Sequence, residues 1–578
     1  MKCFTADFET TTDSNDCRVW AYALCEIGNV DNFQYGNDIK SFIDFCKNKR
    51  ENYKLWFHNL KYDGEYIFSY LLKNGYELIE DKKERREKTF TCLISDTGQF
   101  YSIEIYFEVK NKRVNKVTIY DSLKILNFSV DKIAKAFDLP IRKLKIDYKA
   151  YRRIGHELTK EEVDYIRNDV EIMARALEFM FKEGLNKMTI GADALAYYKK
   201  NCKYFNKYFP MLPYETDGEI RRSYKGGFTY LNDKYVGEEV GEGLVLDVNS
   251  LYPSILHDEY LPFGLPQYFE GKYQENKLYP LYIQTFTCIF EIKKNKIPSI
   301  QLKNNLSFQP TEYIKSSRGE HVTLTLTNID LELFFNQYEV SHITYHSGFM
   351  FKSIKGLFTD YVEHWTEKKI QSKKENNKPM YMTSKLLLNS LYGKFGLNPN
   401  TRSKYPYLDE DGIVHYYITP LQIRNSIYIP IATFVTSYAR RKTILTSQSI
   451  KDFTIDNFND DYYIYSDTDS IHLKYLEEGL LKQFVDIDDY RLGAWKIESR
   501  FRRGKYLRAK TYIEESYDEE ELNVTVAGLP KNLGRYITFE NFENGLSLLA
   551  SDEEIDHKLT FKHVNGGVLL VDTDFTIK

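Results

Sequence analysis

The sequence predicts a multidomain chain with an α/β domain at its start and an α+β architecture beyond it, on three observations. The length of 578 residues far exceeds what one hydrophobic core usually serves. Over roughly the first 190 residues, short β-rich runs (residues 55–58 and 117–120) alternate with helical patterns such as residues 160–182. From residue 226 onward, a strand-like run, a β-rich region and then helical patterns follow one another. We therefore expect at least two differently built parts.

The composition is that of an ordinary globular protein, with 42% hydrophobic and 28% charged residues. The formal net charge of −4 provides no global basic field. This argues against a passive nucleic-acid coat but leaves room for an enzyme with a local basic channel. The 15% of aromatic residues could stack on bases or fill cores equally well.

Cysteine usage and hydropathy predict a cytosolic protein without membrane association. The seven cysteines form no C-x-x-C pair, which indicates reduced thiols and no structural zinc. The first residues lack the apolar run of a signal peptide. Residues 427–439 are too short and too polar a stretch to span a bilayer, so a buried helix is predicted there.

Acidic side chains recur at three places in the N-terminal part. Asp7 and Glu9 are two apart on the expected first strand, so they point to one face. Asp63 follows in W-F-H-N-L-K-Y-D-G, and Tyr165 and Asp169 lie four apart on one helix face. Each pattern alone is more often a solvated surface. Together, four carboxylates can hold two divalent ions about 3.5–4 Å apart and hydrolyse phosphodiesters. Oxygen ligands suit Mg²⁺ or Mn²⁺ rather than zinc.

The part that follows contains elements of several kinds. G-L-V-L-D-V-N-S reads as a strand, and residues 260–361 are rich in β and turn signals. We expect a polar loop at residues 373–379, a helix at 384–395 and an irregular segment at 397–425.

Three further motifs carry chemistry. They are D-V-N-S-L-Y-P at residues 247–253, K-L-L-L-N-S-L-Y-G at 385–393, and Y-S-D-T-D-S at 465–470, the last at a hairpin turn. Helical spacing places Lys385, Asn389 and Tyr392 along one stripe. D-T-D alone is commonly a solvated turn, and N-S-L-Y-G alone could be a helix end. All three in this order are very improbable by chance.

These side chains fit the needs of nucleotidyl transfer. Metal-bridging carboxylates align a primer 3′-OH with the α-phosphate, and a cation such as Lys385 holds the β- and γ-phosphates. A planar side chain packs on the incoming nucleotide, and Tyr252 and Tyr392 are suitable.

Charged runs occur toward the C-terminus. A basic run interleaved with aromatic residues contains Arg500, Arg502, Arg503, Lys505, Arg508 and Lys510. Such a run is usually a solvated face, but its place shortly after the D-T-D turn predicts contact with the phosphates of a primer-template duplex. The acidic stretches at residues 514–521 and 552–556 are expected on exposed surface.

The motifs also carry a resemblance. The motifs at residues 247–253, 385–393 and 465–470 resemble the A, B and C motifs of family B DNA polymerases. K-T-Y at 510–512 and Y-K-G-G at 224–227 resemble that family's K-x-Y and Y-x-G-G motifs. The acidic motifs of the N-terminal part resemble those of DnaQ-like exonucleases. The whole chain looks most like the protein-primed subfamily from small bacteriophages with linear genomes.

The resemblance implies a fold and its boundaries. We expect a DnaQ/RNase H-like α/β exonuclease domain joined to an α+β right hand of palm, fingers and thumb, with two subfamily insertions. The long gaps from Tyr252 to Lys385 and from Gly396 to Asp467 match the places of those insertions. The implied domains are exonuclease 1–189, palm 190–258 and 428–529, priming-protein insertion 259–356, fingers 357–396, strand-displacement insertion 397–427, and thumb 530–578.

The resemblance also implies residue roles. The polymerase metal ligands would be Asp247 and Asp469, with Asp467 beside them in catalysis. Exonuclease metal would be held by Asp7, Glu9, Asp63 and Asp169, with Tyr165 orienting the attacking water. Nucleotide would be bound by Tyr252, which excludes the ribose 2′-OH, and by Lys385, Asn389 and Tyr392. DNA would be bound by Asn59, Tyr62, Ser122, Leu123, Lys143, Tyr224, Gly226, Gly227, Arg508, Lys510 and Tyr512.

Some assignments stay open. Lys143 and Lys145 both precede I-D-Y, and spacing from Asp147 favours Lys143. Any of Lys373, Lys374 and Lys378 could face the nucleotide. Each active site would take two Mg²⁺ ions, with Mn²⁺ as the alternative.

The implied partners are primer-template DNA, dNTPs and a terminal priming protein. The implied enzyme is a monomer in the cytoplasm of an infected bacterial host.

Three alternatives compete with this interpretation. A nuclease whose second half only binds DNA would not need Asp247, Lys385, Asp467 and Asp469. A non-catalytic replication partner would leave both carboxylate groups accidental. A conventional family B polymerase would share the chemistry and differ only in lacking nucleotide transfer to a protein hydroxyl.

Overall fold

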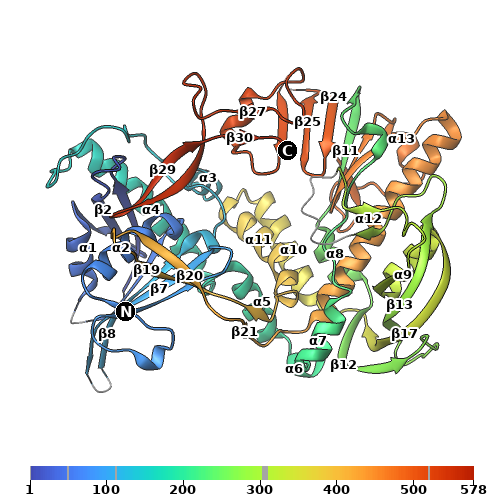
Figure 1. Ribbon diagram of the computed structural model, residues 1–578, viewed down its shortest axis with the longest axis horizontal. Coiled ribbons are helices and arrows are strands. Elements are labelled where there is room, and N and C mark those ends of the chain that lie inside the picture. Colours follow the sequence, from blue (N-terminus) through green and yellow to red (C-terminus); the bar gives the residue numbers. More distant parts are fainter. Residues whose placement is uncertain (1, 49–50, 111–112, 302–309, 519–520) are drawn as a thin grey trace.

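The computed structural model describes residues 2–48, 51–110, 113–301, 310–518 and 521–578. In this part of the chain three large sheets organise the molecule (Figure 1). The N-terminal sheet lies on one side, the sheet that carries the D-T-D turn lies on the other, and helices α10 and α11 stand between them.

The N-terminal sheet has the order β3-β2-β1-β4-β8-β7-β6-β5. Its strands are β1 (Lys2–Thr10), β2 (Val19–Glu26), β3 (Asn29–Gly36), β4 (Tyr53–Phe57), β5 (Glu77–Leu78), β6 (Thr89–Ile94), β7 (Phe100–Lys110) and β8 (Arg113–Asp121). The central strands β1, β4 and β8 are parallel. Both predicted strands are confirmed as β4 and β8.

Four helices accompany this sheet. They are α1 (Ile39–Cys46), α2 (Leu60–Lys73), α3 (Val130–Ala136) and α4 (Lys160–Lys182). Helix α4 packs on β1 and β2 and has the predicted bounds, because Thr159 and Glu162 form a capping box at its start. The predicted α/β domain is therefore confirmed.

The second sheet is antiparallel, with the order β26-β25-β24-β11-β23-β22-β9 and β10 paired to β24. Its strands are β9 (Thr229–Leu231), β10 (Glu239–Val240), β11 (Gly243–Val248), β22 (Tyr463–Asp467), β23 (Ser470–Lys474), β24 (Trp495–Arg508), β25 (Thr511–Ser516) and β26 (Leu522–Val526). The predicted strand before residue 250 is β11, and the D-T-D turn joins β22 to β23.

A third sheet, β12-β17-β13-β16, confirms the β-rich region. Its strands are β12 (Leu261–Glu270), β13 (Leu281–Ile292), β16 (Val322–Thr327) and β17 (Tyr338–Ile354), beside the short pair β14 (Ile300–Gln301) and β15 (Tyr313–Ile314). Helix α9 (Asn328–Gln337) was not predicted. Its Asp330 forms a buried ion pair with Arg440 (2.5 Å), which anchors this sheet to the long helix α12 (Ile429–Phe458).

The polar loop predicted at residues 373–379 is shorter than expected. Helix α10 (Thr359–Lys374) continues through Lys373 and Lys374, and α11 (Lys378–Phe395) begins at Lys378. Asn377 caps α11 by accepting a hydrogen bond from the Met380 N–H (3.1 Å). Pro379 fits the first turn, where its missing N–H costs nothing.

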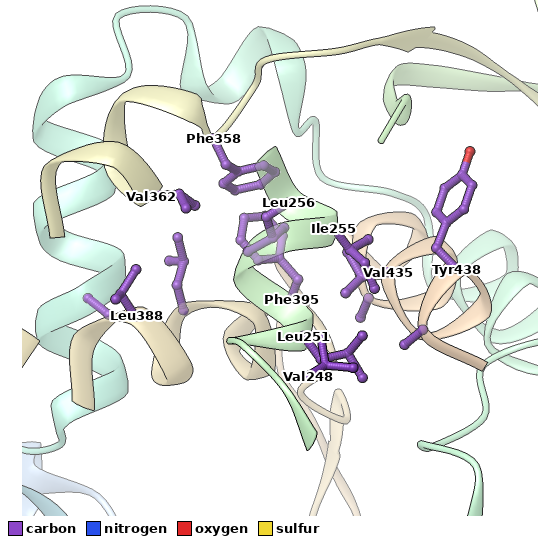
Figure 2. Close-up of a cluster of buried hydrophobic side chains, with 14 of the residues drawn as sticks. Val248, Leu251, Ile255, Leu256, Phe358, Val362, Leu388, Phe395, Val435 and Tyr438 are labelled. Carbon is purple, nitrogen blue, oxygen red and sulfur yellow. The ribbon is translucent and has the colours of Figure 1, made fainter. Parts of the chain in front are cut away.

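An apolar core holds these helices to the second sheet. Figure 2 shows Leu256 of α8 (Leu251–Asp258), Phe358 and Val362 near the start of α10, Phe395 of α11 and Val435 of α12 packed together. All are buried. The first half of α12 is buried throughout, which confirms the helix predicted at residues 427–439. Among the described residues no helix is both long and apolar enough to span a bilayer.

The remaining helices are α5 (Ile190–Asn201), α6 (Phe205–Tyr208), α7 (Tyr214–Arg221) and α13 (Glu478–Leu481). The segment expected to be irregular at 397–425 contains two small ladders, β18 (Asn400–Thr401) with β21 (Gln422–Ile423) and β19 (Lys404–Leu408) with β20 (Val414–Ile418). The C-terminal region forms β27 (Ser547–Leu548) with β30 (Phe575–Thr576) and β28 (Lys558–Val564) with β29 (Gly567–Thr573).

The hairpins β19–β20 and β28–β29 both reach helix α2 of the N-terminal domain (Figure 1). The Tyr416 hydroxyl donates to Glu65 Oε2 (2.8 Å), and the Tyr66 hydroxyl donates to the Val568 carbonyl (2.6 Å). Asn565 joins the two hairpins by donating to the Asp411 carbonyl (2.7 Å). The chain thereby closes on itself, because its last hairpin returns to its first domain.

Candidate active sites

The first carboxylate group assembles as the sequence predicts. Asp7 and Glu9 share one face of β1, and Asp63 lies in the first turn of α2. The Phe8 N–H donates to Asp63 Oδ1 (3.2 Å), which ties this helix to the strand. Asp169 of α4 completes the group. All except Asp7 are buried to below a tenth of their surface.

Crowded negative charge dominates this site. Burial and the Asp169 carboxylate raise the pKa of Asp7 to about 7. Burial and the Asp7 carboxylate raise the pKa values of Glu9 and Asp63 well above their ordinary range. Lys143, not the exposed Lys145, forms an ion pair with Asp169 Oδ2. The site therefore favours cations strongly.

The donor set fits divalent cations that prefer oxygen. Asp169 Oδ1 is buried and has no hydrogen-bond partner, so it stands ready for a metal ion. Within the described residues no three acidic, histidine or cysteine side chains lie close enough together to hold a metal ion. In the structure, Lys143 forms an ion pair with Asp169 Oδ2.

Aromatic and polar residues surround these carboxylates. The Tyr165 hydroxyl bonds to the Tyr148 hydroxyl (2.7 Å), and Tyr148 is half exposed. Sequence reasoning missed Tyr148, which stands one residue after Asp147 in an otherwise irregular loop. Tyr62 bonds to Thr10 (2.5 Å) at the end of β1.

Of the residues predicted to bind the single strand, Asn59 and Leu123 share one hydrogen-bond acceptor, whereas Ser122 is buried. Asn59 has a left-handed backbone (φ 76°), held by its N–H donating to Asp121 Oδ1 (3.0 Å). The Leu123 N–H donates to the same oxygen (3.0 Å), so both predicted residues share one anchor. Ser122 is fully buried and donates to the Phe57 carbonyl (2.9 Å). Its side chain supports the loop rather than reaching the surface.

The second carboxylate group is built by adjacent antiparallel strands. Asp247 is the second-last residue of β11 and pairs in register with Ser470 of β23, which also pairs with Asp467 of β22. The Val248 N–H donates to the Asp469 carbonyl (2.8 Å), and Thr468 takes a left-handed turn conformation (φ 61°). These contacts bring all three aspartates to one end of the sheet.

Nearby charged side chains shift the pKa of Asp247 and form ion pairs with the aspartates of this group. Burial, Glu498 and Asp469 raise the pKa of Asp247 to about 6. Lys496 Nζ lies 3.4 Å from Asp247 Oδ1, and Lys510 Nζ lies 3.3 Å from Asp467 Oδ2. Sequence reasoning missed Lys496 and Glu498. Their spacing of two on β24, opposite β11, is the signal that could have found them.

Two tyrosines form a planar platform beside the aspartates. The rings of Tyr252 and Tyr392 stack with centroids 4.3 Å apart at 21°. The Tyr224 hydroxyl bonds to the Tyr392 hydroxyl (3.2 Å) and fixes its position. On α11, Lys385 and Asn389 are exposed on the same side as Tyr392, while Leu387 and Leu388 are buried. The predicted stripe is therefore present.

A further lysine, Lys369 of α10, lies near Asp247's strand, where its Nζ donates to Ser250 Oγ (3.5 Å). Burial, Lys385 and Lys496 lower the pKa of Lys369, so these ammonium groups converge. Lys378 instead pairs with Asp138 of the N-terminal domain (3.0 Å), and Lys373 lies over the Tyr490 ring. Helical spacing of four between Lys369 and Lys373 was the available signal.

The predicted DNA-binding residues of the second half surround the D-T-D turn. The Lys510 N–H donates to the Tyr465 hydroxyl (3.0 Å), and Tyr512 packs against Tyr465. The Gly226 carbonyl accepts from Arg440 (2.8 Å). A side chain at Gly227 would collide with Thr468, so the Y-K-G-G loop approaches the turn closely.

The basic residues from Arg500 to Lys510 differ in their contacts, because some form ion pairs within the protein and others are exposed. Arg503 is paired with Glu515 (2.7 Å) and Glu239 (3.6 Å) and lies over the Phe539 ring. It is therefore a structural residue. Arg508 is half-buried near the end of β24, whereas Arg502 and Lys510 are exposed.

Comparison with known proteins adds four findings. Residues 45–486 match the family described as DNA polymerase type B, organellar and viral. The DNA polymerase of Bacillus phage M2 is 44% identical over 596 aligned residues, covering all of both chains. That of Bacillus phage phi29 is 41% identical, covering 100% of this chain and 99% of the relative. The solved structure of phi29 DNA polymerase with primer-template DNA superposes with a TM-score of 0.91 at 40% identity over the whole of both chains.

Proposed function

This chain belongs to the organellar and viral type B DNA polymerases, and we propose how its two carboxylate groups divide the work of synthesis and proofreading. It is a DNA-directed DNA polymerase with a 3′→5′ exonuclease, built as an exonuclease domain and a palm, fingers and thumb. The observation that carries the proposal is the presence of two separate carboxylate groups, one largely buried on β1, α2 and α4 and one half-buried at the β11–β22–β23 edge.

Asp247, Asp467 and Asp469 serve nucleotidyl transfer. Asp247 and Asp469 hold the metal ions, while Lys385 holds the triphosphate, with Lys369 beside it. The Tyr252–Tyr392 platform packs against the sugar and base of the incoming nucleotide. Asn389 lines the same face of α11. Lys510 and Tyr512 hold the primer terminus, together with Arg508 and the loop of Tyr224, Gly226 and Gly227.

Asp7, Glu9, Asp63 and Asp169 serve hydrolysis of a frayed primer end. Lys143 positions Asp169, and Tyr165 orients the water that attacks the phosphodiester. Asn59, Tyr62, Ser122 and Leu123 shape the groove for the single strand. A mispaired end unpairs at low cost, so it reaches this site more readily than a paired one.

Polymerases of this family depend on metal ions, and we assign Mg²⁺ to both sites, with Mn²⁺ as the alternative. When bound, two such ions stabilise the charge that develops on the phosphoryl group and the leaving oxygen. The chain's own contribution is to hold four carboxylates in one buried site and three in the other.

We propose domain limits that fall between helices and strands. The exonuclease (1–189) ends before α5, and the insertion at 259–356 contains the third sheet. The fingers (357–396) are α10 and α11. The insertion at 397–427 holds β18 to β21. The thumb (530–578) holds the strand pair β27–β30 and the hairpin β28–β29. The palm comprises residues 190–258 and 428–529.

We also propose protein-primed replication with strand displacement. A terminal priming protein would contact the third sheet and supply the hydroxyl that receives the first nucleotide. Primer-template DNA and dNTPs are the other partners of this monomer, which would act in the cytoplasm of an infected bacterium. Support comes from the full-length similarity to phage polymerases. The proposal of priming fails if no nucleotide is transferred to the cognate protein.

Reciprocal variants test the division of work. Asp247→Asn should abolish primer extension and leave hydrolysis of a single-stranded oligonucleotide intact. Asp169→Asn should do the reverse. Gel-resolved extension and degradation of one labelled primer measure both activities. Loss of both activities in each variant would contradict the assignment of two independent sites.

A further inference from the structure

A cleft lined by aromatic and basic side chains lies apart from both carboxylate groups. Helices α5 and α6, the end of β17 and the start of α10 enclose a cavity of 530 Å³. Tyr197, Tyr204 and Tyr208 line it together with Lys203 and Lys355. None of the residues assigned to either reaction lines this cleft.

Positive charge is concentrated at the cleft. Residues 199–207 contain four lysines and no acidic residue. Within the described part of the chain, neither these lysines nor Lys355 form an ion pair. Asp360 is the one acidic side chain among the described lining residues. The excess of unpaired cations fits a polyanion such as a sugar–phosphate backbone.

Tyr204 supplies an open aromatic face. Half of its surface is exposed (50%), and the ammonium groups of Lys203 and Lys207 lie 5.4 and 5.8 Å from its ring centre. Tyr197 is fixed by contrast, because it stacks on His364 (5.4 Å). The Tyr204 ring also meets the Tyr208 ring edge-on (6.2 Å). A half-exposed ring flanked by cations and by further aromatic side chains is the pattern of sites that bind single-stranded nucleic acid by stacking.

The segment proposed to separate strands is held by the helix that follows the cleft in the chain. Helix α7, which follows α6, holds both ends of that segment. Arg221 donates to the carbonyls of Gly396 and Leu397 (3.2 and 3.1 Å), and Ser426 donates to Asp217 (2.6 Å). Figure 1 shows α5, α6, α7 and β21 gathered at the same lower edge of the molecule.

We propose that this cleft binds single-stranded DNA, and that the strand it holds is the one displaced at the 397–427 insertion. A base stacks on Tyr204 while Lys203, Lys207 and Lys355 contact neighbouring phosphates. Capture of the displaced strand opposes its return to the template. This rests on the strand-displacing role proposed above.

Two variants of exposed residues test the cleft in the full-length protein. One is Tyr204→Ala, and the other combines Lys203→Gln with Lys355→Gln. The probe is a fluorescent oligodeoxythymidine added after primer-template DNA has saturated the polymerase site. We expect Tyr204→Ala to weaken probe binding by about fivefold or more, since stacking contributes about 1 kcal/mol or more per base. The double lysine variant should lower the salt slope by about 1.4, since each phosphate contact contributes about 0.7.

Extension assays then identify the strand. Each variant is run on a primed single-stranded template, with and without a downstream duplex. Slower synthesis only through the duplex supports the displaced strand, whereas slowing on both substrates shows that the cleft holds incoming template. The control pairs Lys40→Gln with Tyr35→Ala, an exposed lysine and a tyrosine as exposed as Tyr204 (50%), both in the N-terminal domain and assigned no role, which should change nothing.

Unchanged probe binding in both variants would overturn the proposal. If nucleotide transfer to the priming protein falls instead, the cleft is a protein contact. A wild-type enzyme that cannot pass the duplex would refute strand displacement, and the binding assay would still decide whether the cleft takes single-stranded DNA.

Discussion

At the residue scale, we propose that the Tyr252 side chain sets the choice between deoxyribonucleotides and ribonucleotides. Its ring is held by stacking on Tyr392 and cannot move aside without losing that contact. A 2′-hydroxyl on the incoming sugar would meet this fixed ring. Specificity of this kind comes from a clash with the wrong substrate as much as from contacts with the right one.

Replacing Tyr252 with Val should therefore admit ribonucleotides. Removing the clash should raise the ratio of ribonucleotide to deoxyribonucleotide incorporation by roughly 10²-fold, a change of about 3 kcal/mol. Single-nucleotide insertion kinetics with ATP and dATP measure this ratio. Tyr35→Val, which changes an exposed tyrosine of the N-terminal domain, serves as the control. An unchanged ratio in Tyr252→Val would remove Tyr252 from this role.

The exonuclease should depend on pH when Mg²⁺ is limiting. Because the pKa of Asp7 is raised to about 7, this carboxyl holds a proton below that pH, and a cation must displace it. The folded chain also binds more protons than the unfolded chain below pH 7, so without metal its stability falls as pH rises toward 7.

Single-strand hydrolysis at limiting Mg²⁺ should thus rise up to about tenfold per pH unit below pH 7 and level off above it. Initial rates across a pH series measure the profile. Saturating Mg²⁺ should flatten it, because excess metal displaces the proton at every pH. Equal profiles at low and high Mg²⁺ would contradict the assigned ligands.

Motif spacing located the acidic residues of both sites, but it could not identify their neighbours. Lys496, Glu498 and Lys369 reach the polymerase site only through strand register and helix packing. The same limit applies to Glu514. It lies in an acidic stretch expected on the surface, yet it is buried and paired with His472 (2.6 Å).

At the scale of elements, local rules predicted regular pieces and missed those set by tertiary contacts. The helix at residues 160–182 and the D-T-D hairpin follow from capping and turn signals. Helix α9 was missed because it lies within a β-rich sequence and is held by the Asp330–Arg440 pair. The ladders of residues 397–427 were missed because two of their strands have only two residues each.

Deleting residues 397–427 tests the role of that segment. The deletion removes hairpin β19–β20 and leaves both carboxylate groups, so synthesis through a downstream duplex should stop while short gaps are still filled. Extension on gapped and duplex-blocked templates measures this difference. A deletion variant that still displaces strands would show that another element separates them.

At the scale of the whole molecule, the chain forms a closed loop because its last hairpin and the β19–β20 hairpin both dock on α2. Sequence patterns gave no sign of this closure, since its contacts join residues hundreds of positions apart, such as Tyr66 with Val568. The resemblance to family B polymerases implies an order of domains. The contacts that close the loop on α2 are seen only in the structure.

Weakening the contacts between hairpin β19–β20 and helix α2 should shorten the time that the enzyme stays bound to DNA. Tyr416→Phe leaves buried Glu65 without its hydroxyl donor, which costs about 1–3 kcal/mol at that contact. Dissociation from a primer-template in the presence of competitor DNA should become faster. Tyr417→Phe, which removes a solvent-exposed contact with Glu80, is the matched control. Equal dissociation of both variants and the wild type would contradict a role for the closure.

The most direct test of the account is synthesis on a singly primed circular single-stranded DNA with dNTPs and Mg²⁺ but no helicase or clamp. A polymerase with a strand-displacing insertion and a closed loop of domains should make products many circles long. Synthesis that halts after one circle would contradict unaided strand displacement, and no extension at all would contradict the assignment of the polymerase site.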